Sequence, residues 1–309
     1  MPQARTAGLN PTRGLAFMRI ARILCLAGLM PSLLLAQARL TARPASEAKQ
    51  GGPALPDIRQ LLREAMDHQK QIDKVRENYT YTSLHTTQDI DAYGQVKKTE
   101  TLEGEDFFVN GHVIERTVKK NGQPLNSHEE QKETGRVTKL VEKAEKLPPD
   151  QPLEGPGITV SRLLEIMDVR NPRRQNYRGR PAIVFDFIGR KDARTHGLVE
   201  DASKKLQGTV WVDEADRQVA HMEVSFNDNF RVAGGLLATI EKGSSFRFDQ
   251  EPVNGELWLP TGGEGTMTAR VLMVKGFRQH VIERDYDYKR FRVETEQRKD
   301  AKVVPGKTK

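Results

Sequence analysis

The stretch from Gln207 to Phe226 constrains the fold most, because apolar and polar residues alternate on both sides of a short acidic turn at Asp213–Arg217. Successive side chains of a strand point to opposite faces. One set of positions is apolar and would share a face: Val210, Val212, Ala220, Met222, Val224 and Phe226. The alternate positions after the turn are polar: His221, Glu223 and Ser225. The pattern predicts an antiparallel hairpin with one apolar and one largely polar face.

Similar alternating runs recur through the chain and predict further antiparallel strands. The first begins at Tyr79, and tight Asn-Gly turns are expected at Asn110-Gly111 and Asn121-Gly122. A strand over 181–188 would place Ile183, Phe185 and Phe187 on one face. Later strands are expected over 236–241, 245–249, 256–259, 266–275 and 280–291, with Gly262 to Gly265 as a hairpin turn and 191–206 as a long polar loop.

Helical patterns are fewer than strand patterns. Asp57 is a candidate N-cap for an amphipathic helix ending near Val75, whose apolar stripe would pack on the sheet. A capping box at Ser127–Glu130 opens a charged helix with an apolar stripe at 137, 140, 141 and 144. A second short helix is expected over 159–167. The fold class predicted is α+β, mainly antiparallel β, with a strongly curved sheet of about ten strands packed on an N-terminal helix.

The first 38 residues have the pattern of a secretory signal peptide. A basic start at Met18–Arg22 precedes an apolar core, and small residues at Ala36 and Ala38 predict cleavage after Ala38. Pro31 interrupts the apolar core, which is shorter than the ~20 residues that span a bilayer. We therefore expect a periplasmic protein with no transmembrane span in its mature chain. The alternative is an uncleaved membrane anchor.

The remaining organisation follows from composition. Residues 39–56 read as a flexible linker, 57–295 as one curved-sheet domain with a helical excursion at 125–157, and 296–309 as a disordered basic tail. Cys25, the only cysteine, would be lost with the leader. Without the leader's four arginines, 45 basic residues face 42 acidic ones. This near balance argues against a nucleic-acid partner.

No catalytic, metal or cofactor motif stands out. The seven histidines are scattered, and none forms a His-Glu-x-x-His or His-x-His pair. A Gly-x-Ser-x-Gly elbow is missing. Asp213 and Asp216 bracket a turn, where aspartate is a common turn former. We expect no metal, no cofactor and no enzymatic activity. A hydrolase built on a carboxylate pair that only the fold assembles is the minor alternative.

Several sequence motifs resemble those of a known superfamily, the periplasmic outer-membrane lipoprotein carriers and their lipoprotein-receptor and sigma-factor-regulator relatives (LolA/LolB/RseB-like). These motifs are Gly-x-Val-Trp-Val-Asp at 208–213, Gln-Val-x-x-Met-Glu-Val at 218–224, and Asn-Gly-Glu-Leu-Trp-Leu-Pro at 254–260. They follow a predicted signal peptide and a predicted amphipathic helix. The resemblance covers about residues 57–295. It implies an incomplete β-barrel of about eleven strands whose concave apolar face holds acyl chains.

The sequence thus predicts an exported cell-envelope binding protein that carries or senses a lipid or a lipidated protein. Large apolar surfaces that are concave usually mark ligand or partner sites. The candidate ligand-binding residues form the apolar face of the sheet: Phe185, Phe187, Val210, Val212, Met222, Val224, Phe226 and Met273. The alternative from another class is a protein-interaction or signalling module that binds envelope proteins through strand edges or the 125–157 excursion.

Overall fold

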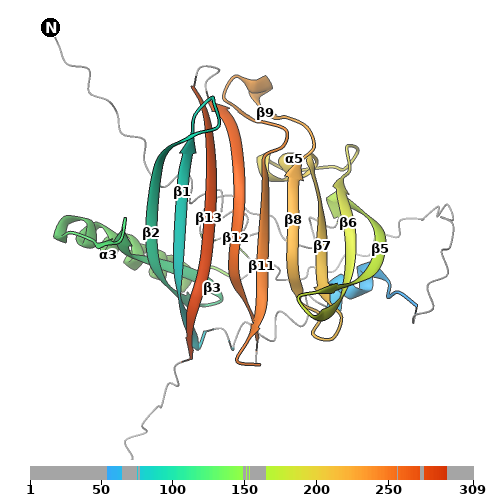
Figure 1. The fold of residues 1–309 in the computed structure, drawn as a ribbon, viewed down its shortest axis with the longest axis horizontal. Helices are drawn as coiled ribbons and strands as arrows, with labels where there is room; N and C mark the ends of the chain where they lie inside the picture. Colours follow the sequence, from blue (N-terminus) through green and yellow to red (C-terminus); the bar gives the residue numbers. More distant parts are fainter. Residues whose placement is uncertain are drawn as a thin grey trace, which may run out of the picture.

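The computed structural model describes residues 54–64, 75, 77–148, 151, 153, 165–255, 257–271 and 275–290. The predicted signal peptide, the basic tail and Met273 lie outside these ranges, as does most of the linker. Within them, the fold is one antiparallel sheet of 13 strands (Figure 1). The sheet is not closed, because its order runs β4-β3-β2-β1-β13-β12-β11-β8-β7-β6-β5. The predicted fold class is confirmed, with more strands than expected.

The strands on the N-terminal side of the sheet form a meander. They are β1 (Tyr79–Ile90), β2 (Val96–Val109), β3 (His112–Lys120) and β4 (Gln123–Pro124). The following strands build the other side: β5 (Met167–Tyr177), β6 (Arg180–Gly189), β7 (Leu206–Asp213), β8 (Val219–Phe226) and β11 (Ser245–Val253). Between the two sides lie β12 (Leu257–Val271) and β13 (Lys275–Arg290). A small flap of β9 (Phe230–Val232), η1 (Ala233–Gly235) and β10 (Ala238–Ile240) pairs with the end of β12.

Asn-Gly pairs make the tight turns that the sequence predicts. Asn110 and Asn121 have φ of 48° and 50°, and the glycine after each has φ of 76°. Two-residue hairpin turns of type I′ require positive φ at both positions, which Asn and Gly tolerate. The predicted turn at Gly262–Gly265 is wrong, because these residues lie inside β12. Gly262 meets the β13 backbone closely: an added Cβ would lie 2.7 Å from the carbonyl oxygen of Glu283.

Two local predictions need correction, a helix over 159–167 and a loop over 191–206. Residues 165 and 166 are helical, but Met167 already begins β5, an edge strand that the sequence analysis missed because charged residues dominate it. The segment expected as a polar loop at 191–206 contains a short helix, α5 (Leu198–Ser203). Local hydrogen bonds fix this segment, since Lys204 donates to the carbonyl of Ala193. Among the described residues, no helix has the length and apolar character needed to cross a membrane.

Two helices cover opposite ends of the sheet (Figure 1). Residues 58–64 are helical, and Asp57 caps them by accepting from the backbone N–H of Gln60 at 2.8 Å. Helix α3 (Ser127–Ala144) packs Leu140 and Ala144 against Ile114 of β3. Its capping box begins one residue earlier than predicted, at Asn126, which pairs with Glu129.

The main hydrophobic core lies against one face of β6, β7, β8 and β11 and includes Leu61 and Leu62 of the first helical segment. Gly208 of β7 is the tightest point of this region. A Cβ at Gly208 would lie 2.0 Å from the carbonyl oxygen of Glu223 and 2.6 Å from the ring of Phe187. Glycine is therefore required there because the neighbouring strand and a core ring occupy the space of any side chain.

We expect Gly208→Ala to lower the free energy of unfolding by about 1–3 kcal/mol, the usual cost of overpacking. Gly135→Ala is the matched control, because Gly135 lies in α3 with no atom within 4 Å of an added Cβ. Alanine should stabilise α3 there by up to about 1 kcal/mol through helix propensity. Urea unfolding measures both. Equal effects of the same sign would contradict the packing described for Gly208.

Candidate functional site

Strand pairing divides the side chains of the sheet into two faces. Residues directly opposite one another on paired strands share a face. One row on the face opposite the hydrophobic core follows the pairings across five strands: Asp186, Thr209, Glu223, Arg247 and Glu264. Two residues further along the strands, a parallel row shares the same face: Ile188, Gln207, Ser225, Ser245, Thr266 and His280.

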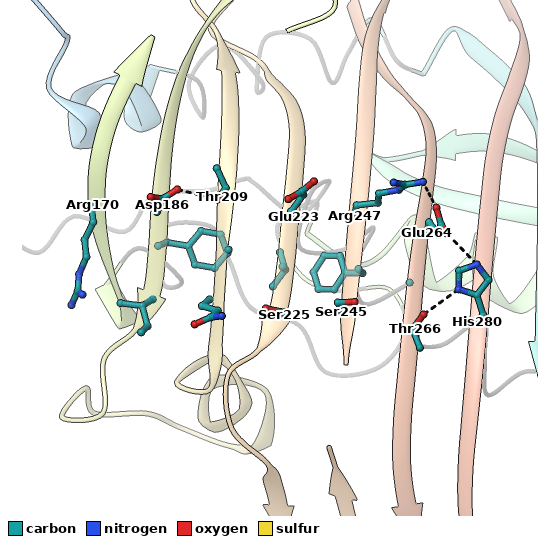
Figure 2. A pocket seen from close by; sticks show the side chains of 17 residues that line it. Arg170, Asp186, Thr209, Glu223, Ser225, Ser245, Arg247, Glu264, Thr266 and His280 are labelled. Carbon is teal, nitrogen blue, oxygen red and sulfur yellow. Dashed lines mark hydrogen bonds and ion pairs between the residues drawn. The ribbon is translucent and has the colours of Figure 1, made fainter. Parts of the chain in front are cut away.

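These two rows line an open depression of about 640 Å³, which we call the polar trough (Figure 2). Its lining is completed by Arg170 and by the residues that lie between the rows on the strands: Phe187, Gly208, Val224, Phe246 and Gly265. Charged side chains in it pair with neighbours on adjacent strands. Arg247 forms an ion pair with Glu264, and His280 Nε2 lies 3.1 Å from Glu264 Oε1. Thr209 donates to Asp186 at 2.9 Å. The trough thus offers polar groups in fixed positions with its charges largely compensated.

An aromatic cluster borders the trough on the same face. The rings of Tyr177 and His221 stack with centroids 5.1 Å apart, and Trp211 lies against His221 at 4.8 Å. Tyr177 donates to Asp249 Oδ1 at 2.6 Å, and His221 Nδ1 lies 2.9 Å from the same oxygen. His221 Nε2 lies 3.3 Å from Glu223, which lines the trough. The sequence analysis placed His221 on a polar face, and this is confirmed.

The Asp249 carboxylate controls the protonation of this cluster. Burial alone would lower the pKa of His221, but the hydrogen bond and negative charge of Asp249, helped by Glu223, raise the pKa of His221 above its ordinary 6.5. Burial would raise the pKa of Asp249, yet hydrogen bonds from His221 and Tyr177 hold it below its usual value. Burial and the Asp249 bond raise the pKa of Tyr177. The cluster therefore favours charged histidine beside carboxylate.

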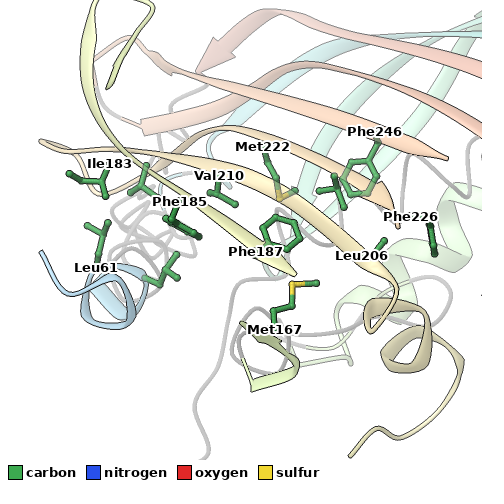
Figure 3. Packing of buried hydrophobic residues seen from close by; sticks show 13 residues of the cluster. Leu61, Met167, Ile183, Phe185, Phe187, Leu206, Val210, Met222, Phe226 and Phe246 are labelled. Carbon is green, nitrogen blue, oxygen red and sulfur yellow. The ribbon is translucent and has the colours of Figure 1, made fainter. Parts of the chain in front are cut away.

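The opposite face carries the predicted ligand-binding residues (Figure 3). The structure brings seven of the eight together in one buried cluster, each at most 8% exposed: Phe185, Phe187, Val210, Val212, Met222, Val224 and Phe226. We call this surface the apolar face. Leu61 and Leu62 of the helical segment pack in the same cluster and are 1% and 5% exposed. At that end, the apolar face is covered by the chain's own side chains.

The same face changes character at β13, β1, β2 and β3, which the sequence analysis did not foresee. Glu283 shares the face of Phe248, because both pair with Gly263. With five further ionisable or polar residues it forms a group, none more than 5% exposed, which we call the acidic cluster: Ser83, His85, Asp106, Glu115, Glu283 and Asp285. His85 lies between two carboxylates, with Nε2 3.2 Å from Glu115 and Nδ1 3.8 Å from Glu283.

The acidic cluster left a faint signal in the sequence. Alternation in β1 places Ser83 and His85 on one face with Tyr79 and Tyr81. The carboxylates that join them come from other strands, and from the sequence alone such charged residues are expected to be exposed. Only pairing of β1 with β13 and β2 shows that they are buried together. Within the described ranges, no group of three or more His, Cys, Asp or Glu residues is placed to hold a metal ion.

Comparison with known proteins gives structural likeness only. No protein-family model matches the chain, and no curated protein matches its sequence. Among solved structures, the chain is similar to a domain assigned to outer membrane lipoprotein sorting from Vibrio parahaemolyticus, with 13% identity, 74% of this chain and 92% of that chain covered, and a TM-score of 0.31.

Two further solved structures extend this likeness. One is a LolA superfamily protein from Nitrosomonas europaea, with 11% identity, 74% and 94% of the two chains covered, and a TM-score of 0.23. The other is the MucA/MucB complex of Pseudomonas aeruginosa, with 12% identity, 72% and 94% covered, and a TM-score of 0.22. The similar structures thus include the superfamily that the sequence resembles. At these scores the likeness says nothing about ligand or partner.

The His221 cluster makes a pH prediction. Because the pKa of folded His221 lies above the unfolded value of about 6.5, protonated His221 stabilises the fold below that pH, and this contribution is lost as pH rises through the folded pKa. NMR titration of the His221 ring should give a midpoint above 6.5. Asp249→Asn should lower this midpoint, and Glu223→Gln should lower it less because the Glu223 side chain is 59% exposed. A wild-type midpoint at or below 6.5 would contradict the role of Asp249.

Proposed function

We propose that this chain is an exported, non-enzymatic binding protein of the cell envelope that holds an acyl chain of a lipid or lipidated polypeptide against the apolar face. The observation that carries the proposal is the convergence of large apolar side chains from β6, β7 and β8 into one continuous surface. Met222 and three phenylalanines supply side chains that can repack around a flexible chain. Each buried CH₂ would contribute ~0.8 kcal/mol.

A ligand would enter by displacing the helical side chains that cover the apolar face. Ile58, Leu61 and Leu62 contact the cluster from the described helical residues 58–64. An acyl chain would take the place of these aliphatic side chains and make equivalent contacts. The acyl chain would keep the face out of water, and its own burial would have to offset the burial that Leu61 and Leu62 lose.

The acidic cluster sets the limit of the acyl site. Contact between hydrocarbon and buried carboxylates would remove their polar surroundings, which is costly. We therefore place the acyl chain over β6, β7, β8 and β11 and away from β1 and β13. Export to the periplasm rests on the predicted signal peptide, which lies outside the described residues.

The interaction-module alternative receives less support at the β5 edge of the sheet. Strand addition needs a regular edge with free N–H groups. Pro172 has no N–H, the β5–β6 register shifts between Arg170 and Arg173, and Asn171 has φ of 51°. Such features block pairing with another strand.

Photo-crosslinking tests the acyl site. A benzophenone amino acid in place of Phe226 on the apolar face should crosslink to a palmitoylated peptide, because the acyl chain would lie within reach. The same group at Trp211, on the opposite face, is the matched control and should not crosslink. The unacylated peptide should fail at both sites. Thermal unfolding verifies that each variant folds.

Other outcomes of this experiment contradict the proposal. Equal labelling by acylated and unacylated peptides at Phe226 would indicate a protein-binding surface instead. Labelling at neither position, with folded variants and saturating acylated peptide, would indicate that the apolar face is permanently filled core. Labelling only at Trp211 would move the ligand to the polar face.

A further inference from the structure

The polar trough has no role in acyl binding, because it lies on the opposite face of the same strands from the apolar face. Its rows hold both signs of charge, and each charged side chain has a partner in the trough or beside it. Arg247 and His280 both pair with Glu264, while Asp186 accepts from Arg173 at 3.1 Å and from Thr209. A strongly charged ligand would therefore find little unbalanced charge to bind.

What remains along the trough is a series of neutral hydrogen-bonding groups. Gln207, Ser225, Ser245 and Thr266 occupy consecutive strands in one row, so their side chains follow one another at the spacing of strands, about 4.8 Å. The two serines are small and leave the depression open next to the longer side chains of Glu223 and Arg247, which lie two residues along the same strands (Figure 2). A ligand lying across the strands would meet a hydroxyl or amide group at every step.

The aromatic cluster adds an apolar platform to this polar row. Trp211 lies two residues from Thr209 and four from Gln207 on β7, so the cluster flanks the trough on the side of Thr209 and Glu223, and Glu223 connects it to the trough through its contact with His221. Aromatic faces carry negative charge density and attract the C–H groups of a ring packed on them. Neutral hydrogen-bonding groups beside an aromatic face match the two surfaces of a sugar, its hydroxyl rim and its C–H face.

A peptide fits the trough less well. The backbone N–H and C=O groups of β7, β8 and β11 are already paired in the sheet, so this face gives a peptide backbone no ladder to join. Protein partners also need apolar anchors at the centre of an interface. At its centre the trough presents Ser225 and Ser245 instead.

We propose that the polar trough binds an uncharged oligosaccharide chain that crosses the strands obliquely, from Thr266 and Ser245 toward β7, with one sugar stacked on the aromatic cluster at Trp211. Ser245 and Thr266 bind its hydroxyl or N-acetyl groups, directly or through water. The site is independent of the proposed acyl site. A variant that loses acyl binding can still be tested for oligosaccharide binding, and the reverse also holds.

Calorimetric titration of the full chain with cellohexaose and with chitohexaose tests the proposal and separates plain hydroxyl recognition from N-acetyl recognition. We expect binding of at least one. Ser245→Phe, which fills the trough, should weaken it about tenfold or more. Thr86→Phe is the matched control: Thr86 lies on the same face, paired with Ile282 beyond the trough, and should leave binding unchanged. Circular dichroism verifies folding, and Thr266→Ala provides a second, milder variant that should also weaken binding.

Tryptophan fluorescence gives an independent readout, because the chain has two tryptophans and only Trp211 borders the trough. Trp258 is 5% exposed and donates to Asp216. Sugar binding should change the emission of the wild type and of Trp258→Phe but not of Trp211→Phe. Failure of both sugars to bind at millimolar concentration would overturn the proposal. Binding that Ser245→Phe leaves unchanged, or binding of an extended peptide in place of sugars, would overturn it equally.

Discussion

The pairing of β1 with β13 is the interaction on which the rest of the sheet depends. It joins the first strand to the last through an eleven-residue register from Tyr79↔Arg290 to Ile90↔Arg278. Without it, the β1–β4 meander and the strands from β5 to β12 would be separate sheets with open edges. Ordering so much chain between paired strands costs entropy, which only a long, continuous ladder offsets. The two terminal strands consequently lie in the middle of the sheet (Figure 1).

This central pairing also explains why one face of the sheet has two chemistries. On the β6–β8 side, the face is filled by aliphatic and aromatic side chains, and on the β13–β1–β2–β3 side by the acidic cluster. Buried carboxylates are tolerated only where partners compensate them, as His85 does between Glu115 and Glu283. Gly104 of β2 makes room for them, since a Cβ there would lie 2.8 Å from Glu115 and 2.9 Å from Ser83.

The two faces of β7, β8 and β11 have separate chemistry because neighbouring residues on a strand point in opposite directions. Met222 belongs to the apolar face, while His221 and Glu223 on either side of it border or line the polar trough. Each strand therefore supports an apolar surface and a hydrogen-bonding surface at once. A protein with two such surfaces can hold a hydrocarbon and a polar chain without the two ligands competing.

Local patterns were enough to predict the hairpin of β7 and β8, the Asn-Gly turns, helix α3 and seven members of the apolar face. Each depends on residues close in sequence, through alternation, positive φ or capping. The strand β5 and the continuity of β12 through Gly262–Gly265 were missed, because charge and glycine weaken a strand pattern and only neighbouring strands stabilise it. By itself, the sequence thus determined which side chains share a face of each strand. Only the tertiary structure decided which strands are neighbours, and therefore which polar residues meet in the trough and which carboxylates are buried, because strand order depends on contacts between residues far apart in the chain.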